Sequence, residues 1–400
     1  MQRKLDLRTG RPVWQAYRAP SVPTEKLARD VRTDVLVVGM GVSGAMIADE
    51  LTAAGHRVVM LDRRGPMLGS TAATTALVQF EIDQPLSRLA LAIGREKAER
   101  AWRRSRLAVV NLAGHIERAQ IECRARPSAS IYLAGNVLDA GALEAEAAAR
   151  RQAGIGATFL PRAALKRGLG VARAAIASSG NLALDPRQLT AALLLRALAQ
   201  GARLFAPAQA VAIEHASDGV TVATADGPTV RAGHAVLATG YELMDAVDAP
   251  RHRIVSTYAI ATRRQPKAVW PGGAMIWESS DPYLYMRPTQ DGRIVCGGED
   301  EEFQDEDRRD ALIGAKTAAI SAKLGKLFPD LDTRPDFAWA GSFGTTETGL
   351  PYIGTLPRKP RIHGILGYGG NGITYSRIAA ELISTALAGR EDSDADLFAF

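Results

Sequence analysis

The chain has 400 residues, a length that favours two domains sharing an interface. Hydrophobic residues make up 46% and charged residues 23% of the chain, which excludes global disorder and fibrous architecture. The 49 lysines and arginines against 43 acids give a net charge of +6 that is spread along the chain, so we expect no nucleic-acid partner.

The cysteine content and the lack of long apolar stretches bear on the compartment. Cys123 and Cys296 are the two cysteines, which excludes a disulfide framework and a cysteine-based zinc site and suits a reducing compartment. The segment Met1 to Arg11 lacks the apolar core of a secretory signal, and no stretch reaches the roughly 20 apolar residues that span a bilayer. We expect a cytoplasmic protein without a transmembrane segment, while peripheral membrane attachment stays open.

The first regular elements form a strand–helix–strand unit. Residues 34–38 are a run of aliphatic residues typical of a buried parallel strand. A glycine-rich loop at 39–44 follows, then a helical pattern at 45–54 and a second buried strand at 57–61. This order predicts the start of a doubly wound α/β sheet.

The loop in this unit carries the spacing of a dinucleotide-binding turn. Gly39 permits a tight turn, Gly41 allows a pyrophosphate to approach the backbone, and Gly44 lets helix and strand pack closely. The helix N-terminus offers free N–H groups to phosphates, and Asp62 at the end of the second strand can accept ribose hydroxyls. The alternative is a close-packed turn without a ligand.

The rest of the chain mixes helices with many short strands. We expect helices over 86–116, 142–152, 189–200 and 373–388 and another ending near Phe328, and strands over 131–133, 208–214, 219–224, 229–231, 234–237 and 362–366 and repeatedly from 254 to 298.

Three further segments join the glycine turn in one order along the chain. They are the small-residue loop Gly69-Ser-Thr-Ala-Ala-Thr-Thr-Ala-Leu-Val-Gln79, the turn Ala238-Thr-Gly240, and the loop Gly367-Tyr-Gly-Gly-Asn-Gly372 before a helix. Together the four segments resemble those of FAD-dependent oxidoreductases of the D-amino-acid oxidase superfamily, which includes glycine and sarcosine oxidases and D-amino-acid dehydrogenases.

The resemblance implies an α/β fold in which a Rossmann-like FAD-binding domain carries an inserted antiparallel-sheet, α+β substrate-binding domain. We expect the FAD-binding domain at 28–124, 184–250 and 340–400, and the substrate-binding domain at 125–183 and 251–339.

The resemblance also assigns FAD-binding residues to the four segments. The expected set is Gly39, Gly41, Val42, Ser43, Gly44, Asp62, Arg63, Gly69, Ser70, Thr71, Thr74, Thr75, Ala76, Val211, Ala238, Thr239, Gly240, Gly367, Gly369, Gly370, Asn371, Gly372, Ile373 and Thr374. The Gly69 loop has no histidine and the C-terminal loop has no cysteine, so we expect non-covalent FAD.

The substrate side is predicted from an alternating strand at 283–287. Tyr283, Tyr285 and Arg287 project to one face of it, where two aromatic rings and a guanidinium could form a pocket with a carboxylate clamp. The alternative is a sheet-surface arginine paired with Glu278 or Asp281.

Further side chains are weaker candidates. Gln79 joins the predicted catalytic set, and Glu81, with the same strand parity, could receive a substrate ammonium or be a surface carboxylate. Trp277 lines the same pocket or belongs to the core. The six histidines show no close pairing in the sequence, so we assign neither a metal site nor a catalytic triad.

The resemblance implies oxidation of a C–N bond of a small amine or amino acid by hydride transfer to flavin N5, followed by hydrolysis of the imine. Two alternatives stay open: a flavin dehydrogenase of a non-amine such as a hydroxy acid, and a non-catalytic FAD-binding electron-transfer subunit. The electron acceptor, whether oxygen, a quinone or a carrier protein, is not predicted. The chain departs from the family at Ala76 and Gln79, where sarcosine-oxidase-like members carry basic residues, and at Thr348, where an aspartate is common.

Overall fold

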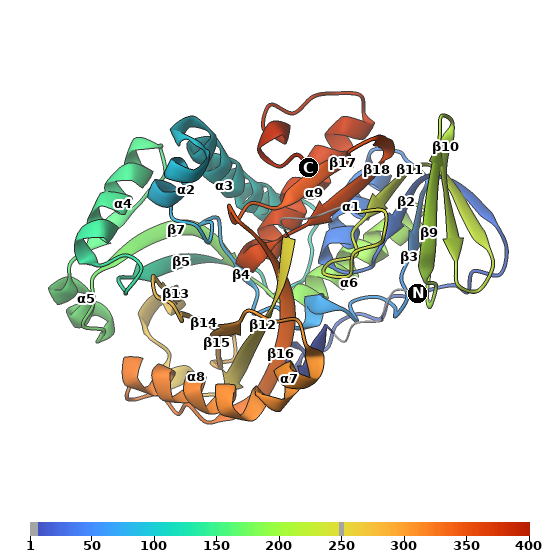
Figure 1. The fold of residues 1–400 in the computed structure, drawn as a ribbon. Helices are drawn as coiled ribbons and strands as arrows, with labels where there is room; N and C mark the ends of the chain where they lie inside the picture. The colour runs from blue at the N-terminus through green and yellow to red at the C-terminus, as the bar shows by residue number, and fades with distance from the viewer. Residues whose placement is uncertain (1–6, 248–251) are drawn as a thin grey trace.

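The computed structural model describes residues 7–247 and 252–400 and shows two sheets with helices packed around them (Figure 1). The first six residues of the segment examined for a secretory signal, and the predicted domain boundary at 250–251, lie outside the described residues.

The first sheet has a parallel centre in the strand order β18-β11-β2-β3-β8. Its middle strands are aliphatic runs whose side chains are buried on both faces, as parallel strands covered by other layers require. Strand β17 adds an antiparallel edge, and the β9–β10 hairpin extends from β11. The strands are β2 (Val31–Val38), β3 (Val58–Leu61), β8 (Arg203–Phe205), β9 (Ala210–Ala216), β10 (Gly219–Thr224), β11 (Thr229–Leu237), β17 (Tyr352–Leu356) and β18 (Lys359–Leu366).

Helix α1 packs against α6 and α9, and α3 packs against α9 and α2 (Figure 1). The helical pattern from 86 to 116 was predicted as continuous, and this was wrong. Gly94, with a φ of +88°, separates α2 from α3, because a left-handed residue ends one helix and reorients the chain before the next. These helices are α1 (Val42–Ala53), α2 (Leu86–Ile93), α3 (Arg95–Arg118), α6 (Pro186–Ala199) and α9 (Gly372–Leu387).

The second sheet is mainly antiparallel, with the strand order β1-β16-β12-β15-β14-β13-β5-β7-β4 and with β6 paired to β7. Only the β13–β5 pair is parallel among its described strands. The strands are β1 (Arg8–Gly10), β4 (Leu77–Val78), β5 (Arg126–Leu133), β6 (Thr158–Leu160), β7 (Ala175–Ala183), β12 (His252–Thr262), β13 (Met275–Glu278), β14 (Leu284–Pro288), β15 (Ile294–Glu301) and β16 (Pro335–Thr346).

Helix α8 contacts β12, β15 and β16 and forms the lower layer in Figure 1, while α4 and α5 lie beside β5 and β7. The remaining helices are α4 (Ala140–Gln152), α5 (Arg162–Leu169), α7 (Glu306–Ala311) and α8 (Ile313–Leu327). The short 3-10 turns are η1 (Val13–Ala16), η2 (Ser70–Ala72), η3 (Pro266–Ala268), η4 (Pro271–Gly273), η5 (Gly369–Asn371) and η6 (Ala395–Leu397).

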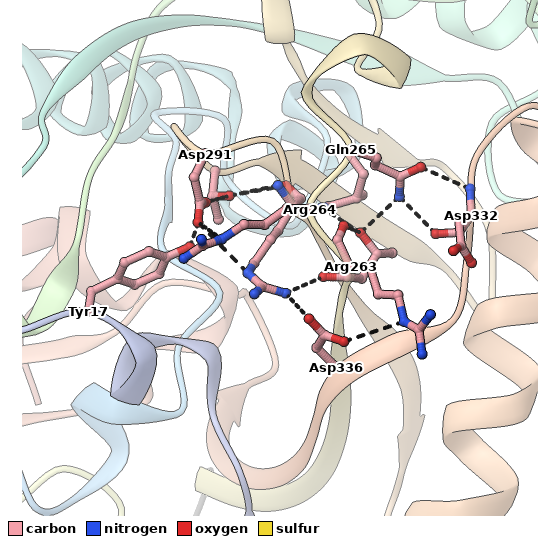
Figure 2. A network of polar contacts seen from close by, with 11 residues as sticks. Tyr17, Arg263, Arg264, Gln265, Asp291, Asp332 and Asp336 are labelled. Atoms are coloured by element: carbon pink, nitrogen blue, oxygen red, sulfur yellow. Dashed lines mark hydrogen bonds and ion pairs between the residues drawn. The ribbon is translucent and has the colours of Figure 1, made fainter.

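A polar network attaches the N-terminal segment to the second sheet (Figure 2). The Tyr17 hydroxyl donates to Asp291 at 2.7 Å, and Arg264 pairs with the same carboxylate at 2.7 Å. Burial raises the pKa of Tyr17 to about 12, so this hydroxyl remains a donor at neutral pH. Gln265 extends the network by donating to the Asp332 carbonyl at 2.7 Å. The chain segment around Tyr17 is therefore held against the second sheet.

The strands of the first sheet all fall within the three segments predicted for the FAD-binding domain. The second sheet takes β1, β4 and the end of β16 from outside the two segments predicted for the substrate-binding domain. The domain boundaries stay a prediction. In the part of the chain that the structure describes, no helix is both long and apolar enough to cross a membrane.

Candidate functional site

A cavity lined by residues of both sheets contains most of the predicted site residues. Its first-sheet wall, defined here as residues 38–43, 61–64, 208–210 and 238–240, follows the strand ends of β2, β3, β8 and β11. On the opposite side, residues of β12, β13, β14 and β16 line the cavity, and we call this side the second-sheet wall.

The glycine turn of the first-sheet wall is fixed by steric contacts. Gly39 has a φ of +114°, and a Cβ there would lie 2.3 Å from the Ala238 carbonyl oxygen. A Cβ on Gly44 would lie 1.9 Å from the Gly39 carbonyl oxygen, so the first turn of α1 packs directly on the strand end. Gly41 and Val42 line the cavity at the helix N-terminus, where the helix dipole favours a phosphate. The Val42 N–H donates to the Thr71 hydroxyl at 3.0 Å, which ties this turn to the small-residue loop.

The end of β3 supplies an acid with a fixed orientation. Asp62 lines the cavity and accepts backbone N–H groups of Met40, Arg64 and Gly65, each at 2.8 Å. A carboxylate has about four lone-pair sites, so acceptor capacity remains for a ribose hydroxyl.

Two arginines beside Asp62 are held by one acid from the segment after β11. Arg64 pairs with Glu242 at 2.7 Å, and Arg63 donates to the same carboxylate. Burial lowers the pKa of Arg63 to about 10. The charges of this wall are therefore largely balanced within the protein.

The small-residue loop lies along the cavity and is anchored by three successive carbonyl groups. Trp339 Nε1 donates to the Ala73 carbonyl at 2.7 Å, and Trp14 Nε1 donates to the Thr74 carbonyl at 2.6 Å. Arg287 Nε donates to the Thr75 carbonyl at 2.9 Å. The expected loop residues Gly69, Ser70, Thr71, Thr74 and Thr75 line the cavity, and the buried Ser70 hydroxyl finds no partner among the described residues, as a group left for a ligand would.

The turn before α9 closes another part of the cavity. Gly369, Gly370, Asn371, Gly372 and Ile373 line it, as do Ala238, Thr239 and Gly240. The Asn371 amide donates to the Glu81 carbonyl at 2.7 Å, and the Gly370 N–H donates to Asp83 at 2.7 Å. This turn is thus tied to the chain segment that follows β4.

Four tyrosines surround one part of the cavity, and we call them the tyrosine cluster: Tyr241, Tyr283, Tyr285 and Tyr368. The rings of Tyr283 and Tyr285 lie 5.7 Å apart, and those of Tyr241 and Tyr368 lie 5.9 Å apart and nearly perpendicular. Burial raises the pKa of all four hydroxyls, so they remain protonated at neutral pH.

Asp83 lies in the cavity beside the tyrosine cluster. Burial among protein atoms raises the pKa of its carboxyl, and the charge of Asp300 adds to the effect. After burial, the charge of Asp83 also contributes to the raised pKa of Tyr241 and Tyr283. Asp300 accepts the Tyr283 hydroxyl at 2.7 Å. The tyrosine oxygen therefore presents lone pairs, and not its proton, to the cavity.

Gln79 and Trp277 complete this region. Both line the cavity with less than a tenth of their surface exposed, and Gln79 Nε2 and Trp277 Nε1 have no partner among the described residues. Trp277 stacks on Tyr132 with ring centres 3.7 Å apart. Trp277 is thus both a core residue and part of the cavity lining, and so it fits both roles predicted for it from the sequence.

Arg287 does not line the cavity, and its prediction as a clamp for a substrate carboxylate is not supported by its position. It is 3% exposed, donates to the carbonyls of Thr75 and Leu184, and lies 4.9 Å from the centre of the Trp14 ring. Burial lowers its pKa to about 9. The strand alternation places Tyr283 and Tyr285 in the cavity, but farther along β14 the small-residue loop separates the arginine from it.

Two other expectations are corrected by the strand registers. Val211 is 50% exposed on β9 and does not line the cavity; Ala208, Gln209 and Ala210 take that place, three positions to one position earlier. Glu81 is 2% exposed and outside the cavity lining, where it accepts the Ser130 hydroxyl. Strand β4 ends at Val78, so the assumed alternation does not reach residue 81.

Four residues expected to bind FAD support the cavity from behind. Gly44, Ala76, Gly367 and Thr374 are not among the lining residues. Thr374, for example, donates its hydroxyl to the Gln79 carbonyl at 2.7 Å and so fixes the backbone of a lining residue.

Several lining residues were not predicted, although each has a sequence signal. Tyr241 directly follows the Ala238-Thr-Gly240 turn, and Tyr368 lies within the Gly367–Gly372 loop. Asp83 is two positions beyond Glu81 in the same polar segment, and Phe343 begins the segment Phe343-Gly-Thr-Thr-Glu-Thr-Gly-Leu-Pro351, which contains Thr348. Two histidines that are distant in the sequence meet in the fold, because His234 and His363 lie on the neighbouring strands β11 and β18 with ring nitrogens 3.3 Å apart.

Comparisons with known proteins agree with this geometry. The family model for FAD dependent oxidoreductases (DAO) matches residues 34–386. The chain is 25% identical over 383 residues to the gamma-glutamylputrescine oxidoreductase of Escherichia coli (strain K12), covering 92% of this chain and 86% of the relative. It is also 25% identical over 370 residues to a glycine oxidase of Bacillus licheniformis, covering 90% of this chain and 94% of the relative.

Solved structures show the same fold. The glycine oxidase from Geobacillus kaustophilus matches with a TM-score of 0.73 at 22% identity over 91% of this chain and 96% of that chain. The L-proline dehydrogenase from P. horikoshii matches with a TM-score of 0.77 at 17% identity over 92% of this chain and 97% of that chain. The predicted fold class, a Rossmann-like domain with a second antiparallel sheet, is confirmed.

The cavity fits the cofactor of this family. Its glycine turn places the N-terminus of α1 in the cavity lining, where the helix dipole favours phosphates, and Asp62 keeps acceptor capacity for a ribose. Ser70 and Gln79 carry buried polar atoms without protein partners among the described residues. The family-model match covers most of the chain. The chain therefore belongs to the DAO family of FAD-dependent oxidoreductases, and FAD is its cofactor.

Proposed function

We propose that this FAD-dependent oxidoreductase oxidises the C–N bond of a small amine or amino acid to an imine, which water then hydrolyses. The supporting observation is that the first-sheet wall, where FAD would bind, and the tyrosine cluster with Asp83 line one continuous cavity. Bound FAD supplies the hydride acceptor. Glycine and γ-glutamylputrescine, the compounds in the names of two relatives, both contain such a bond.

The residues of the chain have three tasks in this reaction. The tyrosine rings and Trp277 present apolar surface that orients a substrate and excludes water. Tyr283 donates to Asp300, so its oxygen can accept an amine N–H. Asp83 can take the proton that an ammonium must lose before its carbon becomes a hydride donor.

The test is anaerobic bleaching of the flavin by matched pairs of compounds that differ in the atom on the oxidised carbon. The pairs are glycine with glycolate and 1,4-diaminobutane with 1,4-butanediol. We expect the nitrogen compound of at least one pair to bleach the flavin and both hydroxy compounds to leave it oxidised. Release of ammonia and a carbonyl product in a 1:1 ratio to the flavin reduced would support C–N oxidation. Bleaching by the hydroxy compounds alone, or by no compound of a wide amine panel, would contradict it.

A further inference from the structure

The charges that face the cavity differ between its two walls. Among the cavity-lining residues in the described ranges, the cations are Arg63 and Arg64, which belong to the first-sheet wall and share Glu242. The second-sheet wall contributes no lysine, arginine or histidine to the described lining, and Asp83 lies close enough to Tyr241 and Tyr283 to affect their pKa. Arg287, the cation nearest in sequence to these tyrosines, spends two donors on backbone carbonyls.

A substrate carboxylate would find no positive partner here. It would face the Asp83 carboxylate and, behind Tyr283, that of Asp300. Asp83 is exposed in the open cavity, so this repulsion becomes large when a bound ligand displaces the water, and like charges brought together then cost several kcal/mol. Substrates with a carboxylate next to the oxidised carbon are therefore disfavoured.

A cationic nitrogen, in contrast, matches each feature of the region. Four tyrosines and Trp277 line the cavity, and aromatic rings attract a cation through their quadrupoles. Asp83 supplies a charge-assisted acceptor, and Tyr283 presents an oxygen whose proton is already donated to Asp300. Asp83 is exposed to the open cavity, and the protein atoms around it together with the charge of Asp300 raise the pKa of its carboxyl, an effect that a cationic partner would oppose.

Two unpartnered donors show that this region has room for a further molecule. Gln79 Nε2 and Trp277 Nε1 line the cavity, belong to side chains less than a tenth exposed, and have no partner among the described residues. They call for an acceptor, which the flavin or a neutral part of the substrate can supply and an ammonium group cannot. Buried polar groups of this kind are normally satisfied by a bound molecule or ordered water.

We propose that the tyrosine cluster and Asp83 select a cationic amine, such as an alkylamine or a diamine, that has no carboxylate next to the oxidised carbon. The inference rests on the proposed C–N oxidation and narrows its substrate class. Asp83 pairs with the ammonium and takes a proton from its nitrogen, which leaves a neutral amine. FAD, when bound, would supply the hydride acceptor for that amine.

The first test compares amines with the amino acids that add one carboxylate to the same skeleton. 1,4-Diaminobutane is paired with ornithine, and benzylamine with phenylglycine, in anaerobic flavin reduction by the holoenzyme. We expect the amine of a pair to have an efficiency at least about 30-fold higher than that of its carboxylated partner. Equal efficiencies, or preference for ornithine and phenylglycine, would overturn the inference and leave the proposed C–N oxidation intact.

The second test measures binding without turnover, so it holds even if no flavin reduction is seen. The oxidised holoenzyme is titrated with butyltrimethylammonium and with pentanoate, and binding is followed by perturbation of the flavin absorbance. We expect the ammonium probe to bind and pentanoate to bind much more weakly or not at all. Tighter binding of pentanoate, or no response to the ammonium probe, would overturn the inference.

Two variants assign the selectivity to one residue. Asp83→Asn keeps an oxygen for the Gly370 N–H but removes the charge, so we expect about 30-fold or greater weakening of the ammonium probe and no weakening of pentanoate. The matched control Asp226→Asn removes the same charge from the exposed turn between β10 and β11 and should change neither titration. Unchanged ammonium affinity in Asp83→Asn would overturn the role of Asp83. The wild-type comparisons decide the substrate class should this variant not retain FAD.

Discussion

The two walls of the cavity are built by different means. The first-sheet wall is shaped mainly by backbone: Gly39 and Gly44 are in contact with neighbouring carbonyl groups that leave no room for a Cβ, and Asp62 is held by three backbone N–H groups. The second-sheet wall is shaped by large side chains such as Tyr283, Tyr285 and Trp277. A backbone wall can hold one constant group, the dinucleotide, whereas a side-chain wall can change with the substrate.

The largest expected effect is on the backbone wall, from Gly44→Ala. The new Cβ would lie 1.9 Å from the Gly39 carbonyl oxygen, so the glycine turn must move. Overpacking against backbone costs about 3 kcal/mol or more, which is roughly 100-fold or more in FAD affinity if the whole cost falls on the bound turn. The measurement is flavin content per chain after purification, with FAD titration of the apoprotein.

The matched control for Gly44→Ala is Gly168→Ala on helix α5. A Cβ at residue 168 meets no atom within 4 Å, and alanine favours the helix by up to about 1 kcal/mol. We therefore expect normal flavin content and equal or higher stability. Normal flavin content in Gly44→Ala as well would contradict the steric account of the first-sheet wall.

The next largest effect concerns Arg287, where position predicts a structural and not a substrate-binding role. Arg287→Ala leaves the buried carbonyls of Thr75 and Leu184 without these donors and uncovers one face of Trp14. We expect the free energy of unfolding to fall by about 2–4 kcal/mol and FAD to be held less firmly, since Thr75 lines the cavity. Chemical denaturation and flavin content measure both.

A ratio separates this role from a substrate clamp. If Arg287 positions the loop, the ratio of flavin-reduction efficiencies for benzylamine and phenylglycine should be the same in Arg287→Ala and in the wild type. A selective loss of efficiency with phenylglycine would show that Arg287 binds the substrate carboxylate, as the sequence pattern predicted.

Residues of both walls could be predicted from the sequence, but for different reasons. Gly39, Gly41 and Gly44 could be assigned because the steric needs of a strand–turn–helix unit depend only on neighbours in the chain. Tyr283 and Tyr285 were predicted from strand alternation, and both line the cavity, Tyr285 on β14 and Tyr283 directly before it.

The errors arise where a long-range partner decides. Arg287 obeys the same alternation as the tyrosines, but nothing in the sequence near it shows that the small-residue loop reaches its guanidinium. The prediction of Val211 as a cofactor-binding residue was off by one to three positions, because the register of the β9–β10 hairpin is set by pairing between its strands. Asp83 was overlooked because its importance depends on the distant Gly370, Tyr241 and Tyr283.

The smallest expected effect is on the pH dependence of stability, and it tests whether the interior of the first sheet can hold a charged histidine. His363 is 3% exposed on β18 and faces His234, and burial, with His234 as a second cause, lowers its pKa to about 4. An unfolded histidine titrates near 6.5, so at pH 5.5 the unfolded chain binds a proton that the folded chain does not. Stability from this residue is thus present above pH 6.5 and is lost as the pH falls toward 4.

The size follows from the two pKa values. Between pH 7.5 and pH 5.5 the folded chain should lose about 1 kcal/mol of unfolding free energy through His363, and His363→Gln should remove that part of the slope even if it lowers stability at both pH values. The measurement is chemical denaturation at the two pH values with saturating FAD, and the exposed His215→Gln is the control that should keep the wild-type slope. An unchanged slope in His363→Gln would mean that the folded sheet accepts the charged imidazole, and that burial between β11 and β18 excludes protons less strictly than the packing of the first sheet indicates.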